Sequence, residues 1–106
     1  MASGRLTTHV LDQAAGRPAA GLKIELFRLT DSTPQLISSA VTNLDGRTDG
    51  PMAYGESFTL GTYELLFHAG DYLKAAGHVG DGILFLDTIP LRFGIADVDQ
   101  HFHVPL

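Results

Sequence analysis

Apolar and polar residues alternate over short stretches of this chain, which is the pattern of strands with one buried face. In the stretch Leu22–Leu29, the apolar residues Leu22, Ile24 and Leu26 share one face, and Lys23 lies on the other. Five further stretches have strand character: Leu6–Asp12, Gln35–Thr42, Phe58–His68, Ile89–Ile95 and Gln100–Leu106. Successive side chains of a strand point to opposite faces, so each stretch predicts one face toward a core.

Turn residues separate these stretches. Gly16 and Pro18 predict a loop after the first strand, and Thr30–Pro34 ends in a proline that predicts a turn. The Asp-Gly pair within Asn43–Arg47 predicts a tight turn, because glycine readily takes a positive φ. Residues 48–57 are rich in glycine and proline, and we expect an irregular segment there.

One short segment has helical character. Asp71–Ala76 contains good helix formers, with Asp71 as the expected N-cap and Gly77 as the expected stop. Pro90 in the stretch that follows favours a strand start or a sheet edge. Six or seven short strands with regular turns and one short helix predict an all-β, antiparallel β-sandwich formed by a single domain over residues 1–106.

Composition narrows the class of protein. With 106 residues and 44% hydrophobic residues, the chain has enough apolar material for one small core. The formal net charge of −5 and seven scattered Lys and Arg residues argue against nucleic-acid binding. Cysteine is absent, which excludes disulfides and cysteine nucleophiles. No run approaches the roughly 18 apolar residues of a membrane span, and Met1–Arg5 starts no secretory signal, so we expect a cytoplasmic protein.

Histidine supplies the candidate chemistry. In the first strand, Leu6, Thr8 and Val10 share the expected core face, and His9 shares the opposite face with Thr7. Imidazole titrates close to neutral pH, so it can accept or donate a proton there. Taken alone, a single strand histidine is usually a surface residue or a hydrogen-bonded filler, so His9 needs partners elsewhere.

The last strand carries two more histidines. His101 and His103 are two residues apart and therefore project from one face, as a pair of zinc ligands would, but no compact third ligand lies near them in the sequence. We interpret His101 as a rim residue outside any site, and His68 and His78 as structural. Arg47, just after the tight turn, would be a solvated surface residue by default. Two histidines and an arginine would suit hydrolysis, in which imidazole activates water and guanidinium stabilises the developing negative charge.

Three segments together resemble one family. Leu6–Asp12 followed by Gly16–Ala19, then Thr42–Arg47, then His101–Leu106 are similar, in order, to the 5-hydroxyisourate hydrolases, the transthyretin-related enzymes of purine breakdown. The resemblance implies a transthyretin-like β-sandwich, assembled as a homotetramer with sites in a channel between subunits. It also implies hydrolytic opening of the 5-hydroxyisourate ring to 2-oxo-4-hydroxy-4-carboxy-5-ureidoimidazoline, on the route from urate to allantoin, without a cofactor.

The resemblance carries three site residues. The histidine of the first strand matches His9, the arginine of the Asp-Gly-Arg motif matches Arg47, and the histidine of the His-Val-Pro-Leu motif matches His103. These three residues would bind the substrate and carry catalysis, with no metal. Either histidine could be the base. Transthyretin, the hormone carrier, lacks these polar residues in its channel, so their presence favours an enzyme over a carrier.

One departure from the family concerns the C-terminal side. Family members continue past His-Val-Pro-Leu into a last strand and a Tyr-Arg-Gly-Ser ending, whereas this sequence stops at Leu106. Either the sequence is a shortened form or this version is impaired. If Leu106 is the true end, we expect a weaker sheet edge, poorer tetramer assembly and low activity.

Two other functions remain open on the sequence. A non-catalytic transthyretin-like carrier or assembly module would bind an aromatic ligand without converting it. A histidine-based metal-binding sandwich is the third hypothesis, and metal analysis of the purified protein would test it.

Overall fold

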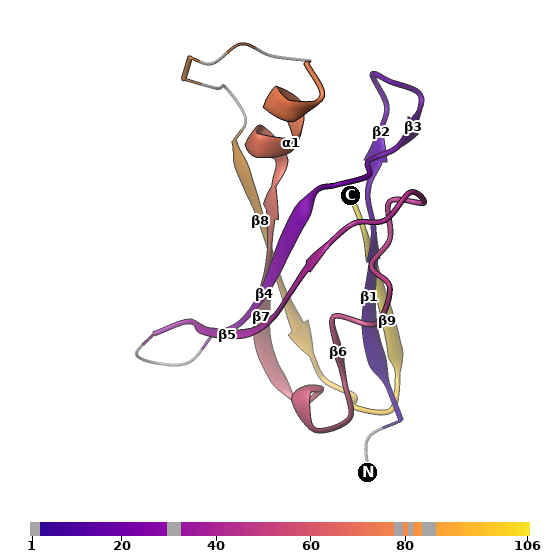
Figure 1. Cartoon of the computed structure of the whole chain (residues 1–106). Helices are drawn as coiled ribbons and strands as arrows, with labels where there is room; N and C mark the ends of the chain where they lie inside the picture. The colour runs from indigo at the N-terminus through magenta and orange to yellow at the C-terminus, as the bar shows by residue number, and fades with distance from the viewer. Residues whose placement is uncertain (1–2, 30–32, 78–79, 81, 84–86) are drawn as a thin grey trace.

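Two β-sheets face each other in the structure, a computed structural model that describes residues 3–29, 33–77, 80, 82–83 and 87–106. One sheet has the strand order β6-β1-β9 and the other β5-β4-β7-β8, while β2 and β3 form a small separate hairpin (Figure 1). The strands are β1 (Arg5–His9), β2 (Leu11–Asp12), β3 (Arg17–Pro18), β4 (Lys23–Leu29), β5 (Gln35–Val41), β6 (Ala53–Tyr54), β7 (Gly61–His68), β8 (Thr88–Ile95) and β9 (His101–Pro105). The helices are α1 (Ala69–Ala75) and a 3₁₀ turn (Gly55–Ser57).

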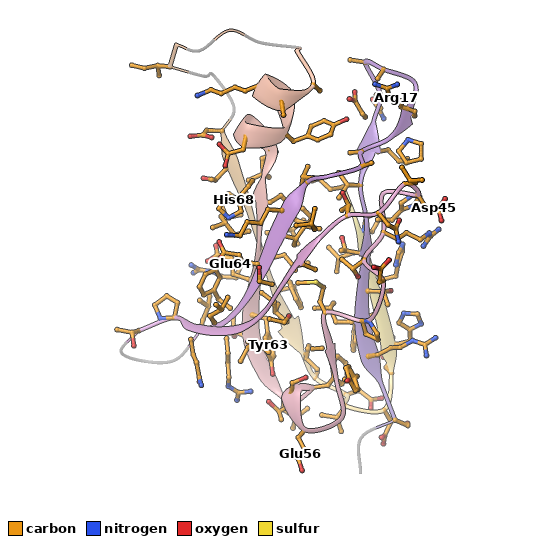
Figure 2. All side chains as sticks on the ribbon, in the orientation of Figure 1. Arg17, Asp45, Glu56, Tyr63, Glu64 and His68 are labelled. Carbon is orange, nitrogen blue, oxygen red and sulfur yellow. The ribbon has the colours of Figure 1, made fainter. Side chains whose placement is uncertain are left out.

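The six longer strands lie within the stretches that the alternation predicts, and the predicted buried faces of the first strand and of Leu22–Leu29 are confirmed. Leu6, Thr8 and Val10 point inward from β1 and the residue after it, with 0–4% of their surface exposed. Leu22, just before β4, and Ile24 and Leu26 within it are also buried. So are three residues of one β7 face, Tyr63, Leu65 and Phe67. Side chains of both sheets fill the space between the layers (Figure 2). Burial of these apolar faces is the main force that holds the two sheets together.

The pairing of β1 with β9 is parallel, which corrects the expectation of an antiparallel sandwich at this point. After β8 the chain crosses to the other sheet through residues 96–100 and enters it beside the start of β1. The Gly4 N–H donates to the Val98 carbonyl at 2.9 Å, which fixes that entry. The two strands, which lie side by side in Figure 1, therefore run in the same direction. In this register Thr7 is opposite His103.

The predicted first strand, Leu6–Asp12, is divided in two. Pairing with the end of the chain continues past this point, since the Leu106 N–H donates to the His9 carbonyl at 2.9 Å and the Leu11 N–H donates to the Leu106 carbonyl at 3.0 Å. On its other side, the Val10 N–H donates to the Gly46 carbonyl at 2.8 Å and the Val10 carbonyl accepts from the Ala19 N–H at 3.0 Å. The loop predicted around Gly16 is the tip of the β2–β3 hairpin. The turn containing Gly46 is thus bonded to the residue that follows β1.

The helix begins earlier than the sequence predicts, and the N-cap prediction was wrong. His68 occupies the N-cap of α1 and makes no side-chain capping bond, whereas Asp71 lies within the first turn. The Gly70 N–H donates instead to the Asp87 carbonyl at 2.8 Å, so a neighbouring segment replaces a cap. The stop at Gly77 is confirmed, with φ of 77° and its N–H bonded to the Lys74 carbonyl.

Pro90 lies in β8, at the edge of the four-stranded sheet, as its sequence predicts. Residues 30–32 of the predicted turn, and His78, lie outside the described residues. None of the helices formed by the described part of the chain has the length and hydrophobicity needed to span a bilayer.

Candidate active site

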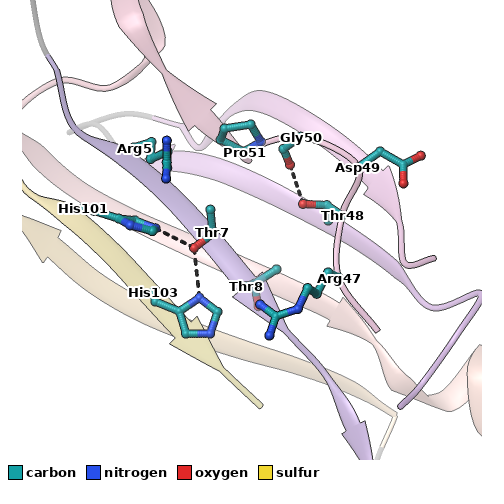
Figure 3. A pocket seen from close by; sticks show the side chains of 10 residues that line it. All are labelled: Arg5, Thr7, Thr8, Arg47, Thr48, Asp49, Gly50, Pro51, His101 and His103. Atoms are coloured by element: carbon teal, nitrogen blue, oxygen red, sulfur yellow. Dashed lines mark hydrogen bonds between the residues drawn. The ribbon is translucent and has the colours of Figure 1, made fainter. Parts of the chain in front are cut away.

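A cavity of about 500 Å³ opens on the outer face of the three-stranded sheet, where β1, β9 and the segment after the tight turn meet. Ten residues line it: Arg5, Thr7, Thr8, Arg47, Thr48, Asp49, Gly50, Pro51, His101 and His103 (Figure 3). Two guanidinium groups and two imidazoles thus surround one space. This lining suits a small polar molecule with carbonyl oxygens or negative charge.

Strand register explains why residues so far apart in the chain meet here. Parallel pairing places Arg5 opposite His101 and Thr7 opposite His103, and side chains two residues apart share a face. Thr7 Oγ1 lies 2.8 Å from His101 Nε2 and 2.9 Å from His103 Nδ1 (Figure 3). The threonine therefore links the two imidazoles, and His103 Nε2 makes no hydrogen bond to any described residue.

Arg47 enters the site from a rigid turn. Asn43 Oδ1 accepts from the Asp45 and Arg47 backbone N–H groups at 2.9 and 3.2 Å, and the Arg47 carbonyl accepts from Asn43 N–H at 2.7 Å. Gly46 has φ of 75°, and a Cβ there would lie 2.3 Å from the Val10 carbonyl oxygen. Only glycine satisfies both the positive φ and this close approach.

The Arg47 side chain is exposed and has no hydrogen bond or ion pair with the described residues. Its guanidinium and the His103 ring reach toward the same space (Figure 3). A guanidinium without a protein partner can donate several hydrogen bonds to a ligand.

His9 lies beside the cavity and is not part of its lining. Its backbone forms an isolated antiparallel bridge with Arg47, and its ring Nε2 lies 2.8 Å from the Asp45 carbonyl oxygen. A carbonyl only accepts, so Nε2 carries the proton and Nδ1 of the neutral ring holds a lone pair. The structure thus brings Arg47 and His103 into one cavity, with His9 against the turn that carries Arg47.

His103 is electrostatically distinct. Partial loss of solvent around the imidazole, followed by the nearby charges of Arg47, His101 and His9, lowers the pKa of His103 below its usual value. The lowered pKa favours the neutral form of the ring at pH 7. A neutral imidazole with a free ring nitrogen is a competent proton acceptor.

The sequence interpretation missed several lining residues. His101 was expected at the rim outside the site, but it lines the cavity and bonds to Thr7. Arg5 and Thr7 were not candidates, although Thr7 shares a face with His9 in the strand pattern. The missing information was the partner of β1, because the parallel register places Arg5 and Thr7 beside the two histidines.

His68, interpreted from the sequence as structural, is not part of the cavity lining and contacts a glutamate. Its Nε2 lies 2.6 Å from Glu25 Oε1, and both side chains are about one-fifth exposed. Within the described residues, no three His, Cys, Asp or Glu side chains gather into a group that could hold a metal ion.

Comparison with known proteins agrees with this geometry. Residues 6–106 match the model of the HIUase/Transthyretin family. The chain is 61% identical over 104 residues to 5-hydroxyisourate hydrolase 2 of Rhizobium meliloti, and the match covers 98% of this chain and 87% of that protein.

Solved structures also resemble the fold. A crystal structure of (S)-allantoin synthase superposes with a TM-score of 0.91 at 48% identity, over 99% of this chain and 40% of that chain. The 5-hydroxyisourate hydrolase of Klebsiella pneumoniae gives a TM-score of 0.77 at 27% identity, over 96% of this chain and 86% of that chain. The transthyretin-like β-sandwich expected from the sequence is confirmed. The chain therefore belongs to the HIUase/Transthyretin family.

Proposed function

We propose that this protein hydrolyses 5-hydroxyisourate to 2-oxo-4-hydroxy-4-carboxy-5-ureidoimidazoline, in the degradation of urate to allantoin. The observation that carries the proposal is that the imidazole of His103 and the guanidinium of Arg47 line one cavity and reach toward the same space. The chain's 61% identity to a 5-hydroxyisourate hydrolase supports the choice of substrate.

The reaction begins with water at the ring carbonyl. His103 Nε2 accepts a proton as the water oxygen bonds to the carbonyl carbon, and a tetrahedral intermediate forms. The carbon–nitrogen bond of the ring then breaks, and the imidazolium returns its proton to the leaving nitrogen. One proton of the water thus ends on the freed nitrogen and the other on the new carboxyl group, which ionises to a carboxylate by releasing that proton to solvent.

Arg47 and His9 complete the proposed site. The Arg47 guanidinium donates hydrogen bonds to the carbonyl oxygen as negative charge develops on it. His9, held through Nε2 by the Asp45 carbonyl, presents Nδ1 as a hydrogen-bond acceptor for the substrate or the attacking water. We assign the base to His103 because its ring lines the cavity and its pKa is lowered.

The test follows the loss of freshly generated 5-hydroxyisourate by ultraviolet absorbance. The unmodified chain should accelerate this loss, and Arg47→Ala should lower kcat/KM by about 10²–10³-fold, as loss of a transition-state hydrogen-bond donor does. Arg92→Ala is the matched control, because the Arg92 side chain is 66% exposed in β8 of the other sheet. Binding of an aromatic ligand without turnover would favour a carrier and refute the hydrolase.

Assembly and location also belong to the proposal. We propose a homotetramer, because the site opens on an outer sheet face that a second subunit could close. Light scattering coupled to size exclusion tests this, and a monomeric, active protein would refute it. We propose the cytoplasm as the compartment, which cell fractionation tests.

A further inference from the structure

The hydroxyl of Thr7 lies between two imidazoles. It is within hydrogen-bond distance of His101 Nε2, at 2.8 Å, and of His103 Nδ1, at 2.9 Å. We call these three side chains the threonine bridge. It crosses from β1 to β9, and all three members line the cavity (Figure 3).

Proton counting restricts the tautomers of this bridge. A hydroxyl has one proton to donate and can accept at its lone pairs, so it cannot donate to both ring nitrogens at once. At least one of the two imidazoles must therefore donate an N–H to Thr7. A continuous chain of donors can run from His103 through Thr7 to His101, or in the opposite direction.

The direction of this chain decides what His103 offers to the cavity. If the chain runs from His101 to His103, then Nδ1 of His103 accepts, and the proton of the neutral ring lies on Nε2. If it runs from His103 to His101, then Nδ1 carries the proton and Nε2 holds a free lone pair. Only the second tautomer can take a proton from water at Nε2.

The charges around His103 favour a neutral ring. Arg5 and His9 on β1, His101 on β9, and Arg47 after the turn are the basic groups near it, and Asp49 is the acidic side chain in the lining. A neutral imidazole has two tautomers, and only the tautomer with a bare Nε2 can accept a proton at that atom. The whole protein population can therefore act as a base only if one tautomer is fixed. A hydrogen bond to the second ring nitrogen commonly fixes that position in proteins.

We infer that Thr7 and His101 are positioning residues that hold His103 with its proton on Nδ1, so that Nε2 is bare toward the cavity. This inference rests on the proposed hydrolase function. In this arrangement His103 Nδ1–H donates to Thr7 Oγ1, and the Thr7 hydroxyl donates to His101 Nε2. When Nε2 takes the proton of water, the Nδ1–H bond to Thr7 becomes charge-assisted and stronger, which stabilises the imidazolium that forms.

The variant that tests the bridge is Thr7→Val, which removes the hydroxyl and keeps the β-branched shape that strands favour. We expect kcat to fall by about 10- to 100-fold with KM little changed. This loss is smaller than the roughly 10⁴-fold loss seen when a serine protease loses the aspartate that orients its histidine, because the threonine hydroxyl is uncharged. Thr7→Ser should restore most of the activity. Thr62→Val, at an exposed position of β7 in the other sheet, is the matched control and should keep full kcat.

Imidazole ¹⁵N chemical shifts supply a readout that a purely structural role would not move. In the unmodified protein at neutral pH, His103 should show a protonated Nδ1 and a bare Nε2. Thr7→Val should shift both nitrogens toward an averaged mixture of tautomers, and Thr7→Ser should restore the original shifts.

Two results would overturn the inference: a spectrum of the unmodified protein with the His103 proton on Nε2, or an unchanged kcat in Thr7→Val. In the second case, an inactive His103→Ala would leave the hydrolase function standing. An unmodified chain without turnover would instead refute the hydrolase function, while the ¹⁵N spectrum would still report the tautomer.

Discussion

Two polar clusters on opposite sheets contain similar groups but differ in how many of their hydrogen bonds are made within the protein. The first, which we call the tyrosine cluster, consists of Arg28, Thr59 and Tyr63; the second is the threonine bridge. In the tyrosine cluster the Arg28 guanidinium donates to Thr59 Oγ1, to Tyr63 OH at 2.9 Å and to the Leu60 carbonyl at 2.9 Å. Tyr63 is fully buried, and its hydroxyl donates to the Thr59 carbonyl at 3.0 Å.

Hydrogen-bonding groups at the threonine bridge are left without protein partners among the described residues. His103 Nε2 and the neighbouring Arg47 guanidinium have no hydrogen-bond partner among the described residues, and both face a cavity. The tyrosine cluster instead closes on itself around Tyr63, which Figure 2 labels in the four-stranded layer. A saturated polar cluster can contribute stability, whereas an unsaturated one keeps donors and acceptors for a ligand.

The largest expected effect is a loss of turnover, without a loss of stability, when His103 of the threonine bridge is replaced. His103→Ala removes the proposed base and should lower kcat by about 10²–10⁴-fold. Its exposed side chain contributes little to packing, so the urea midpoint should stay close to that of the unmodified protein. Turnover measurements and urea titrations of the same preparation check both outcomes. Near-normal turnover would remove His103 from the catalytic role.

An intermediate effect should appear in the tyrosine cluster, with the opposite signature. Tyr63→Phe keeps the buried ring but deprives Arg28 and Thr59 of a hydrogen-bond partner, which should cost about 1–3 kcal/mol of unfolding free energy. Its kcat and KM should match those of the unmodified chain. A large loss of activity without a loss of stability would show that the two clusters are not separable in this way.

The smallest expected effect concerns the pKa of His103. Arg47 is one of the charges that lower this pKa, so Arg47→Ala should raise it toward the usual histidine value. In the unmodified protein the neutral base persists below the usual histidine pKa, so activity should be lost only as the pH falls through the lowered value. In Arg47→Ala, protonation of His103 should begin at a higher pH.

Proton NMR titration of the His103 ring measures this shift without relying on turnover. Arg92→Ala, again the control, should leave the His103 titration unchanged. An unaltered titration in Arg47→Ala would show that the guanidinium does not act on the imidazole.

Local pattern was enough to predict much of this fold. The alternation in Leu22–Leu29 identifies which β4 residues are buried, and the Asp-Gly pair identifies the turn that carries Arg47. These features depend on neighbours within a few residues. The family motifs added His9, Arg47 and His103, of which Arg47 and His103 line the cavity.

Long-range pairing was beyond reach of the sequence. Nothing near Thr7 reveals that its partner is His103, because the contact joins residues 96 positions apart. The parallel register of β1 and β9 follows from how the chain crosses between sheets after β8, which is a property of the whole fold. The prediction of the α1 N-cap was wrong for the same reason. The Gly70 N–H, which a local capping side chain would have bonded, donates instead to the carbonyl of Asp87, a residue outside the helix.

The parallel contact between β1 and β9 also determines when the site can exist during synthesis. A ribosome releases Thr7 early and His103 only 96 residues later, so β1 must wait for its neighbour while the other sheet is being completed. A nascent chain that lacks β9 has neither imidazole of the threonine bridge. The threonine bridge therefore cannot form until β9 has been made, however early β1 folds.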